Sequence, residues 1–441
     1  MSETWIRGGK VYGAKGFTQS DLVVGDIGAY VADQGAQPPA SAAVIDARGL
    51  YVGPAFFDLH THSRTPGKDG SESPESLFRS AVTGGFGGVV AMANTDPPID
   101  HVAILEETKK RFERLPIQFI QGASVTIGRQ GERLVDMVAL KEHGAVFFSD
   151  DGDVIASARV MKRALEYSRA LNVLVAEHAQ DAELAFGGVM NEGETSYLLG
   201  VQGVGEVAES IVVARDLELN RVVRGNLHLM HLSTLGSLGL LRYAKDNGIS
   251  FSSEVTPHHL LISDSELATF DTSYKVNPPL RSKDTCRALR SALREGLIDA
   301  VATDHAPHAK HLKERSIKEA PFGLIGLQSA FAATFTAMMQ EADPDVDEDI
   351  AIETALSTVL QSMSIRPREI LAKVTQDELL PNSFVVLNPN IEVSQRESDV
   401  ESLSKNSPYL DRKLRGQVVS LIVGGKVVLQ DCEIKGEGVS R

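Results

Sequence analysis

Hydrophobic and polar positions alternate along the middle of the chain in two repeating kinds of segment. Short apolar runs read as strands, and the longer amphipathic stretches between them read as helices. The strand candidates are GPAFFDLHTH (53–62), GGVVAMANT (87–95), IQFIQGASV (117–125), GAVFFSDDG (144–152), VLVAEHA (173–179), LHLMHLS (227–233), ISFSSEVTPHH (249–259) and GLIDAVATDH (296–305). Helix candidates include PESLFRSAVTGG (74–85), HVAILEETKKRFERL (101–115), RLVDMVALKEHG (133–144) and LGSLGLLRYAKDNG (235–248). Several of these helical stretches end at Gly or Asn-Gly, a common stop for a helix.

This alternation predicts an α/β fold with parallel strands. Eight strands separated by helices favour a closed (β/α)8 barrel of the TIM type. A doubly wound open sheet is the structural alternative. No glycine-rich GxGxxG loop follows the first strand to favour that alternative.

The two ends of the chain have a different pattern, with short strands separated by turns. We therefore expect one small β-sheet domain built from both ends. The predicted division is residues 1–52 and 382–441 for this domain and residues 53–381 for the barrel. The polar stretch SQRESDVESLSKNSPYLDRK (394–413) is expected to lie over the surface as a loop.

Polar side chains with metal-binding groups recur at the ends of the predicted strands. The carboxyl ends of barrel strands meet at one mouth, so these side chains are expected to converge there. They are His60 and His62 after the first strand, Asp150 and Asp151 after the fourth, His178 after the fifth, His231 after the sixth and Asp304 after the eighth. Such ligands suit zinc, although manganese or cobalt would also be accepted. Their number exceeds the need of one tetrahedral zinc with an open position, which favours two metals.

The carboxylates have distinct expected roles. Asp151 is favoured as the bridge between two metals, with Asp150 supporting it or capping a helix. Asp304 could take a proton from an activated water and return it to a leaving nitrogen. This chemistry is hydrolysis of an amide-like bond. Arg64, two residues after His62, suits an anionic ligand.

The order of these ligands resembles the amidohydrolase superfamily. Many of its cyclic amidases use a carboxylated lysine at the end of the fourth strand, whereas this chain has Asp151 there, as class I dihydroorotases do. Further blocks similar to that family are HTHSRTPG (60–67), MANTDPPID (92–100), SDDG (149–152), AEHAQD (176–181), MHLST (230–234), EVTPHHL (254–260), KVNPPLR (275–281), TDHAPH (303–308), PFGLIGLQSA (321–330), SKNSPY (404–409) and LRGQVVSLIVGGKVV (414–428).

The resemblance implies reversible cyclisation of N-carbamoyl-L-aspartate to L-dihydroorotate in de novo pyrimidine (UMP) biosynthesis. It implies one or two Zn²⁺ per subunit and Asp304 as the acid/base. The implied metal ligands are His60, His62, Asp151, His178, His231 and Asp304. The implied substrate-binding residues are Arg64, Asn94, Asn277 and His308.

Some of these positions have a simpler interpretation. Asn94 precedes Asp-Pro-Pro and Asn277 precedes two prolines, so each could be an ordinary turn residue. The charged segment 305–323 is either a loop that closes over the mouth or a solvated connector. In the first case the backbone groups of Phe322 and Gly323 would meet the substrate.

Composition limits the partners. The chain has 441 residues and a formal net charge of −15, which argues against nucleic acid and anionic membranes as partners. An anionic substrate would need local positive charge. The two cysteines, the absence of a bilayer-length apolar run and a start unlike a secretory signal favour the cytoplasm. We expect a homo-oligomer, and the resemblance adds aspartate transcarbamoylase as a candidate partner.

Three other functions compete with this interpretation. An allantoinase or hydantoinase is disfavoured by the missing bridging lysine and by Arg64. An inactive dihydroorotase-like scaffold for aspartate transcarbamoylase is disfavoured because every expected ligand position is filled. A metal-binding sensor without turnover has only Asp304 against it.

Overall fold

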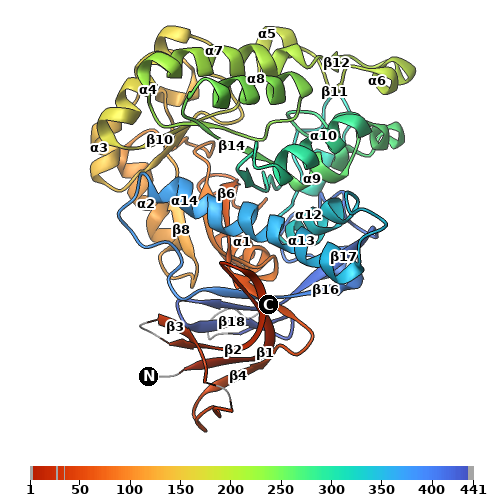
Figure 1. The fold of residues 1–441 in the computed structure, drawn as a ribbon. Coiled ribbons are helices and arrows are strands. Elements are labelled where there is room, and N and C mark those ends of the chain that lie inside the picture. Colours follow the sequence, from red (N-terminus) through yellow and green to blue (C-terminus); the bar gives the residue numbers. More distant parts are fainter. Residues whose placement is uncertain (1–2, 26–27, 34, 436–441) are drawn as a thin grey trace.

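A closed barrel and a mixed sheet make up the computed structural model, which describes residues 3–25, 28–33 and 35–435 (Figure 1). Within those residues the barrel has eight parallel strands in a three-stranded and a five-stranded sheet. They are β6 (Phe56–Thr61), β7 (Phe86–Ala91), β8 (Gln118–Gln121), β9 (Phe147–Ser149), β10 (Leu174–Glu177), β13 (Leu227–Leu229), β14 (Ser252–Val255) and β15 (Ala300–Val301).

Two parallel bridges join these sheets into a ring. Ala123, after β8, pairs with Phe148 of β9, and Thr61 of β6 pairs with His305, after β15. The second bridge brings the first and last strands together, and the backbone N–H of His62 donates to His305 O at 2.9 Å. The fold class predicted from the sequence, a (β/α)8 barrel, is confirmed.

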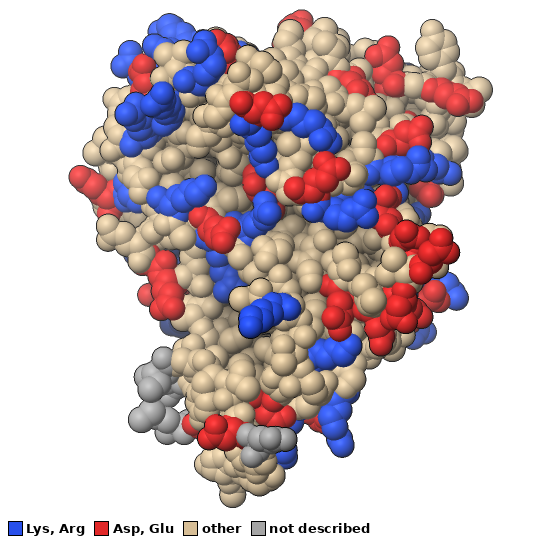
Figure 2. Space-filling model, in the orientation of Figure 1, with Lys and Arg blue, Asp and Glu red and all other residues tan. Residues whose placement is uncertain are grey.

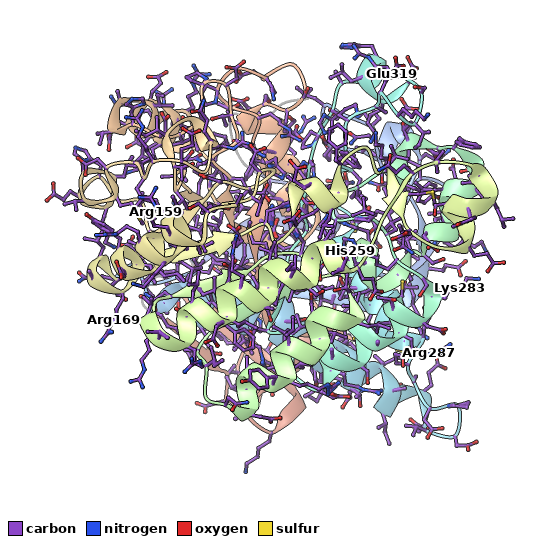
Figure 3. The ribbon with its side chains drawn as sticks, turned by 90° about the horizontal axis from the view of Figure 1, so that it is seen from above. Arg159, Arg169, His259, Lys283, Arg287 and Glu319 are labelled. Carbon is purple, nitrogen blue, oxygen red and sulfur yellow. The ribbon has the colours of Figure 1, made fainter. Side chains whose placement is uncertain are left out.

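Helices surround the barrel. The main ones are α1 (Pro74–Thr83), α2 (Val102–Phe112), α3 (Met137–Glu142), α4 (Ala158–Leu171), α7 (Val207–Val223), α8 (Leu235–Asp246), α10 (Lys283–Arg294) and α12 (Ala330–Met339). Figure 3 shows α7 and α8 side by side across the outside of the barrel. The chain continues through α13 (Glu348–Leu360) and α14 (Arg366–Ala372). Shorter elements in the connections are β11 (Met190–Asn191), β12 (Gly203–Val204), α5 (Ala182–Ala185), α6 (Glu194–Leu199), α9 (Pro257–Leu261) and α11 (Lys310–Lys313).

Several elements are shorter than the sequence pattern predicts. Helix α3 begins at Met137 because the side chain of Asp136 accepts from Ala139 N and caps it there. Strand β6 ends at Thr61, and Arg64 has φ 60°, so the extended backbone does not reach Arg64. His231 and Asp304 also have positive φ, at 33° and 47°. The backbone therefore turns sharply where the metal-binding side chains occur.

The mixed sheet combines both ends of the chain, as predicted. Its N-terminal strands are β1 (Thr4–Gly13), β2 (Gly16–Gly25), β3 (Gly28–Val31), β4 (Ala43–Asp46) and β5 (Tyr51–Pro54). Its C-terminal strands are β16 (Phe384–Ser394), β17 (Lys413–Val423), β18 (Lys426–Gln430) and β19 (Glu433–Ile434). The two groups join where β16 runs antiparallel to β5. The division of the chain into domains at residues 52 and 381 stays a prediction.

The connection between β16 and β17 is the main departure from the expected fold. The sequence predicts that residues 394–413 lie over the surface, and this is wrong for their centre. Ser402, Ser404 and Asn406 are buried, and Tyr409 is 1% exposed. The side chains of Ser402, Ser404 and Asn406 have hydrogen-bond partners in the barrel, which a polar composition does not reveal.

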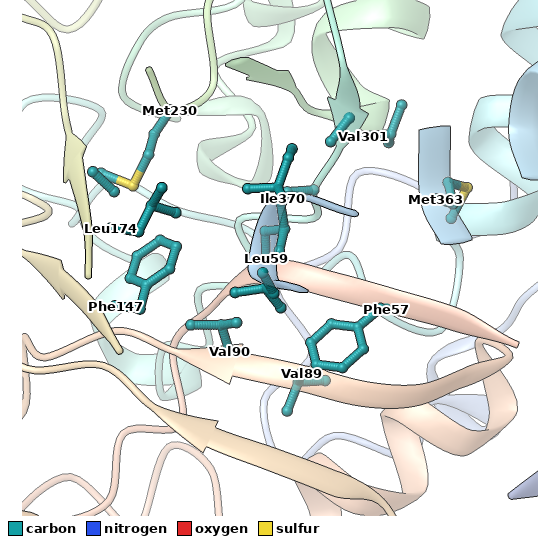
Figure 4. Packing of buried hydrophobic residues seen from close by; sticks show 14 of the residues in the cluster. Phe57, Leu59, Val89, Val90, Phe147, Leu174, Met230, Val301, Met363 and Ile370 are labelled. Carbon is teal, nitrogen blue, oxygen red and sulfur yellow. The ribbon is translucent and has the colours of Figure 1, made fainter. Parts of the chain in front are cut away.

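Apolar side chains fill the space between the barrel strands and the helices. Figure 4 shows part of this core, including Phe57, Leu59, Val90 and Ile370. On the surface, acidic and basic side chains are intermingled over most of the face in Figure 2. Among the described residues, no helix is both long enough and apolar enough to span a lipid bilayer.

An aromatic stack joins the barrel to the mixed sheet. The centroid of the Phe331 ring, in α12, lies 6.0 Å from the ring centroid of Phe56 and 5.8 Å from that of Phe335. Gly416 of β17 has φ +98°, and a Cβ there would come within 2.9 Å of the Phe331 ring. The strand therefore approaches the aromatic face closely.

We predict that Phe331→Ala lowers the free energy of unfolding by about 3–5 kcal/mol, because it removes a fully buried ring. Chemical denaturation would measure this loss. The matched control is Phe186→Ala, whose side chain is 80% exposed, with an expected change of about 0.5 kcal/mol or less. Equal effects of the two substitutions would contradict the prediction.

Candidate metal centre and active site

Two groups of buried side chains at the mouth of the barrel share Asp151. One group is His60, His62 and Asp151, and the other is Asp151, His178 and His231. In each group one donor atom per residue lies within 4.8 Å of the others. The structure thus brings together five of the six ligands expected from the sequence, and Asp304 lies against them.

The first group collects nitrogen atoms between two carboxylates. His60 Nε2 lies 3.4 Å from Asp151 Oδ2 and 3.6 Å from Asp304 Oδ1. His62 Nε2 lies 2.9 Å from Asp304 Oδ1 and 3.4 Å from Asp151 Oδ2. These donor atoms face a common point.

The second group faces the other oxygen of the same carboxylate. Asp151 Oδ1 lies 3.4 Å from His231 Nε2 and 3.6 Å from His178 Nδ1. The two imidazole nitrogens are 2.9 Å apart. Each oxygen of Asp151 therefore faces one pair of histidines, an arrangement in which this carboxylate would be able to bridge two metal ions.

Partners on the outer ring nitrogens fix the orientation of the imidazoles. His60 Nδ1 lies 2.8 Å from Glu254 Oε1, and Glu254 Oε2 lies 3.0 Å from His228 Nε2. His62 Nδ1 lies 2.8 Å from the side-chain oxygen of Asn94. Each ring can donate from Nδ1 and keep the lone pair of Nε2 for a metal, as histidine ligands do.

The donor set fits divalent metal ions. Among the described residues, buried His60 Nε2 has no hydrogen-bond partner. A buried imidazole nitrogen without a partner is costly unless something else binds it. Imidazole nitrogens and carboxylate oxygens are ligands that zinc accepts. The structure therefore supports a binuclear metal site.

The charges around this group favour the binding of cations, as the pKa shifts of its members indicate. Burial would lower the pKa of His60, but Asp151 and Glu254 beside it raise that pKa well above its usual value. Burial would raise the pKa of Asp304, but His62 and His60 lower it. Asp304 is thus a carboxylate at neutral pH and can accept a proton.

Arg64 and His308 lie together beside this group. Arg64 is buried, and its Nε donates to Pro307 O at 3.0 Å. Burial lowers the pKa of Arg64 to about 10, so the guanidinium stays charged at neutral pH. Its Nη2 lies 3.4 Å from His308 Nε2, which donates to Phe322 O at 2.7 Å.

Asn277, Phe322 and Gly323 are the other substrate-binding residues expected from the sequence. The Asn277 side chain donates to His178 Nε2 at 3.1 Å, and Gly323 N donates to Lys275 O at 2.9 Å. Asn277 and Phe322 line a cavity of about 250 Å³. Figure 3 places Glu319, from the same 305–323 segment, at the outer edge of the molecule.

Some residues have roles that the sequence did not predict. The carboxylate of Asp150 accepts from Val125 N at 2.8 Å and Thr126 N at 3.0 Å, so it holds the segment after β8. Sequence reasoning missed Glu254, although a carboxylate within a strand-like run is a signal, since buried acids are rare without a partner. It also missed Asn406, which donates to Gly323 O, although its place in the family-like block SKNSPY (404–409) was a signal.

Comparison with known proteins gives consistent matches. A family model described as Dihydro-orotase-like matches residues 49–237. The chain is 37% identical to the dihydroorotase of Streptomyces coelicolor, over 98% of this chain and 99% of that protein. It is 37% identical to the dihydroorotase of Carboxydothermus hydrogenoformans, over 88% of each.

Solved structures of hydantoinases share the fold. The L-hydantoinase (dihydropyrimidinase) of Arthrobacter aurescens matches with a TM-score of 0.85 and 22% identity, over 99% of this chain and 98% of that chain. The dihydropyrimidinase of Brevibacillus agri matches with a TM-score of 0.80 and 20% identity, over 99% and 97%.

The barrel, the mixed sheet and the histidine–aspartate groups define a metal-dependent cyclic amidohydrolase. Relatives at this level of identity extend over nearly the whole chain. The chain belongs to the dihydroorotase family, as its sequence motifs predicted.

We predict that Glu254→Gln weakens metal binding by about 10- to 100-fold, because His60 loses the carboxylate that orients its ring. Competition with a chelator would measure the metal affinity. The matched control is Glu295→Gln on the surface near α10, which should leave the affinity unchanged. An unchanged affinity in Glu254→Gln would show that the ring is held by other contacts.

Proposed function

We propose that this chain catalyses the reversible cyclisation of N-carbamoyl-L-aspartate to L-dihydroorotate, a step of de novo pyrimidine (UMP) biosynthesis. The observation that carries the proposal is the place of Asp304. Its Oδ1 lies 2.9 Å from His62 Nε2, beside the carboxylate that both histidine pairs share. The identity of the relatives, which are dihydroorotases, supports the same reaction.

Zinc is the metal that we propose for this site, with one or two ions per subunit. The proposed ligands are His60, His62, Asp151, His178, His231 and Asp304, with Asp151 as the bridge. When bound, such ions supply Lewis-acid polarisation of a carbonyl group and activation of water. The acids and bases of the chain must then move the protons.

Asp304 is the proposed acid/base. In ring opening, its carboxylate accepts a proton as water attacks the ring carbonyl carbon. The bond between that carbon and the ring nitrogen then breaks, and Asp304 returns the proton to the nitrogen. The carbon becomes a carboxyl group, which releases its proton to solvent as a carboxylate, and the nitrogen becomes the terminal NH₂ of the ureido group. In ring closure the same carboxyl group acts in the reverse order.

Arg64 is the proposed anchor for the substrate carboxylate. The guanidinium offers a fork of donors that matches a carboxylate, and its burial strengthens that interaction. Asn94, Asn277, His308, Phe322 and Gly323 are proposed to bind and orient the ring. In the structure, Asn94 and Asn277 contact the ligand histidines, so each would serve both the metal site and the substrate.

Assembly and location are further parts of the proposal. We propose a homo-oligomer in the cytoplasm, with aspartate transcarbamoylase as the candidate protein partner. Size determination of the protein alone and mixed with a transcarbamoylase would test both associations.

The decisive assay is ring opening of L-dihydroorotate by the zinc-loaded protein, with hydantoin and allantoin as parallel substrates. Turnover of dihydroorotate alone is the expected result. Turnover of hydantoin or allantoin instead would make the chain another cyclic amidase. Bound metal without turnover of any substrate would favour the scaffold function and overturn the proposal.

We predict that Asp304→Asn lowers kcat for dihydroorotate by about 100- to 10,000-fold, because the amide cannot accept and return the proton. Circular dichroism should show a retained fold. Asp284→Asn, an exposed position on α10, is the matched control and should keep full activity. Normal turnover by Asp304→Asn would refute the acid/base role.

A further inference from the structure

The connection between β16 and β17 reaches from the mixed sheet to the mouth of the barrel. Ser402 Oγ and Leu403 N both donate to the buried carboxylate of Glu72, which lies between β6 and α1. The same carboxylate lies 3.0 Å from His305 Nε2, next to Asp304. Ser404 Oγ donates to Ser71 O at 2.7 Å. These contacts hold residues 402–404 against the two loops that carry Arg64 and Asp304.

Asn406 continues this contact into the 305–323 segment. The residue is 5% exposed, and both its side-chain oxygen and its side-chain nitrogen have hydrogen-bond partners. Oδ1 accepts from His308 N at 3.2 Å. Nδ2 donates to Ala306 O at 3.1 Å and to Gly323 O at 3.2 Å. One amide therefore joins the start of the segment, residues 306–308, to its end at Gly323.

The backbone of Asn406 strengthens the same junction. Its carbonyl oxygen accepts from Ile325 N at 3.0 Å, and Ala306 N donates to Leu324 O at 2.7 Å. The two ends of the segment are thus held side by side, with Asn406 against both. Lys313 Nζ also donates to Gly323 O at 2.9 Å, from within the segment itself.

The residues held in this way are those that orient Arg64. Pro307 lies between Ala306 and His308, both of which Asn406 contacts, and its carbonyl oxygen accepts from Arg64 Nε at 3.0 Å. His308 lies within 3.4 Å of the Arg64 guanidinium and donates to Phe322 O. A shift of residues 306–308 would remove the anchor of the guanidinium, because Pro307 O is the acceptor that fixes its Nε.

We propose that Asn406 is a positioning residue for substrate binding, which acts through residues 306–308 and Gly323 to hold Arg64 and His308 in place. The role of those two residues toward the substrate rests on the proposed function. The connection between β16 and β17 of the mixed sheet then forms part of the active site.

The test compares two substitutions of Asn406 with a control in the same connection. Asn406→Ala removes all three side-chain contacts. Asn406→Asp keeps the size and the acceptor for His308 N, but turns an oxygen toward two carbonyl oxygens. Ser398→Ala is the control, because within the described part of the chain its exposed hydroxyl hydrogen-bonds only to the neighbouring Asp399.

We predict that both Asn406 variants raise KM for L-dihydroorotate about tenfold and change kcat less than about threefold, with metal content unchanged. Substrate binding is weakened because Arg64 is less well held, whereas Asp304 and the metal ligands keep their own contacts. Ser398→Ala should match the unmodified protein. An unchanged KM, or a loss confined to kcat, would overturn the proposal.

Amide hydrogen exchange of the protein without substrate provides a second readout. Faster exchange over residues 306–325 is expected in Asn406→Ala but not in Ser398→Ala. Unaltered exchange would overturn the proposal even if activity fell. Should the unmodified protein fail to open dihydroorotate, the proposed function would be lost, while exchange would still decide whether Asn406 holds the segment.

Discussion

The carboxylate of Asp151 is the point on which the arrangement of the mouth depends. A buried carboxylate is costly unless it is paired, and Asp151 is only 4% exposed. Its two oxygens face the histidines of two different groups. Those histidines follow or end β6, β10 and β13, so the low-energy environment of Asp151 exists only when these strands have assembled. Metal binding would add to the same constraint, because it fixes the ligands and the fold together.

Closure of the barrel supplies the remaining member of the site. Asp304 follows the last strand and His62 follows the first, and the bridge between Thr61 and His305 brings them together. Sharp turns with positive φ at His231 and Asp304 then aim the side chains inward. Such conformations are costly for residues other than glycine and persist where the surroundings hold them. At the mouth of the barrel, the geometry of the site therefore overrides the backbone conformations that these residues would otherwise prefer.

The mixed sheet contributes more than support for the barrel. It is built from both ends of the chain, and β16 pairs with β5 directly before the barrel begins. The long connection after β16 crosses to the mouth, where Glu72 and the carbonyl groups of the 305–323 segment satisfy its polar atoms. The polar sequence of this connection therefore reflects internal hydrogen bonds and not only contact with solvent.

The sequence by itself determined the alternation of strands and helices and the barrel class, and it predicted the candidate metal-binding residues at the strand ends. These follow from local hydrophobic periodicity and from the rule that parallel strands share one functional edge. Only the tertiary structure decided that Glu254 orients His60, that Asp150 holds the segment after β8, and that Asn406 contacts the 305–323 segment. These contacts join residues far apart along the chain, and no local pattern records which distant partner will satisfy a buried polar group.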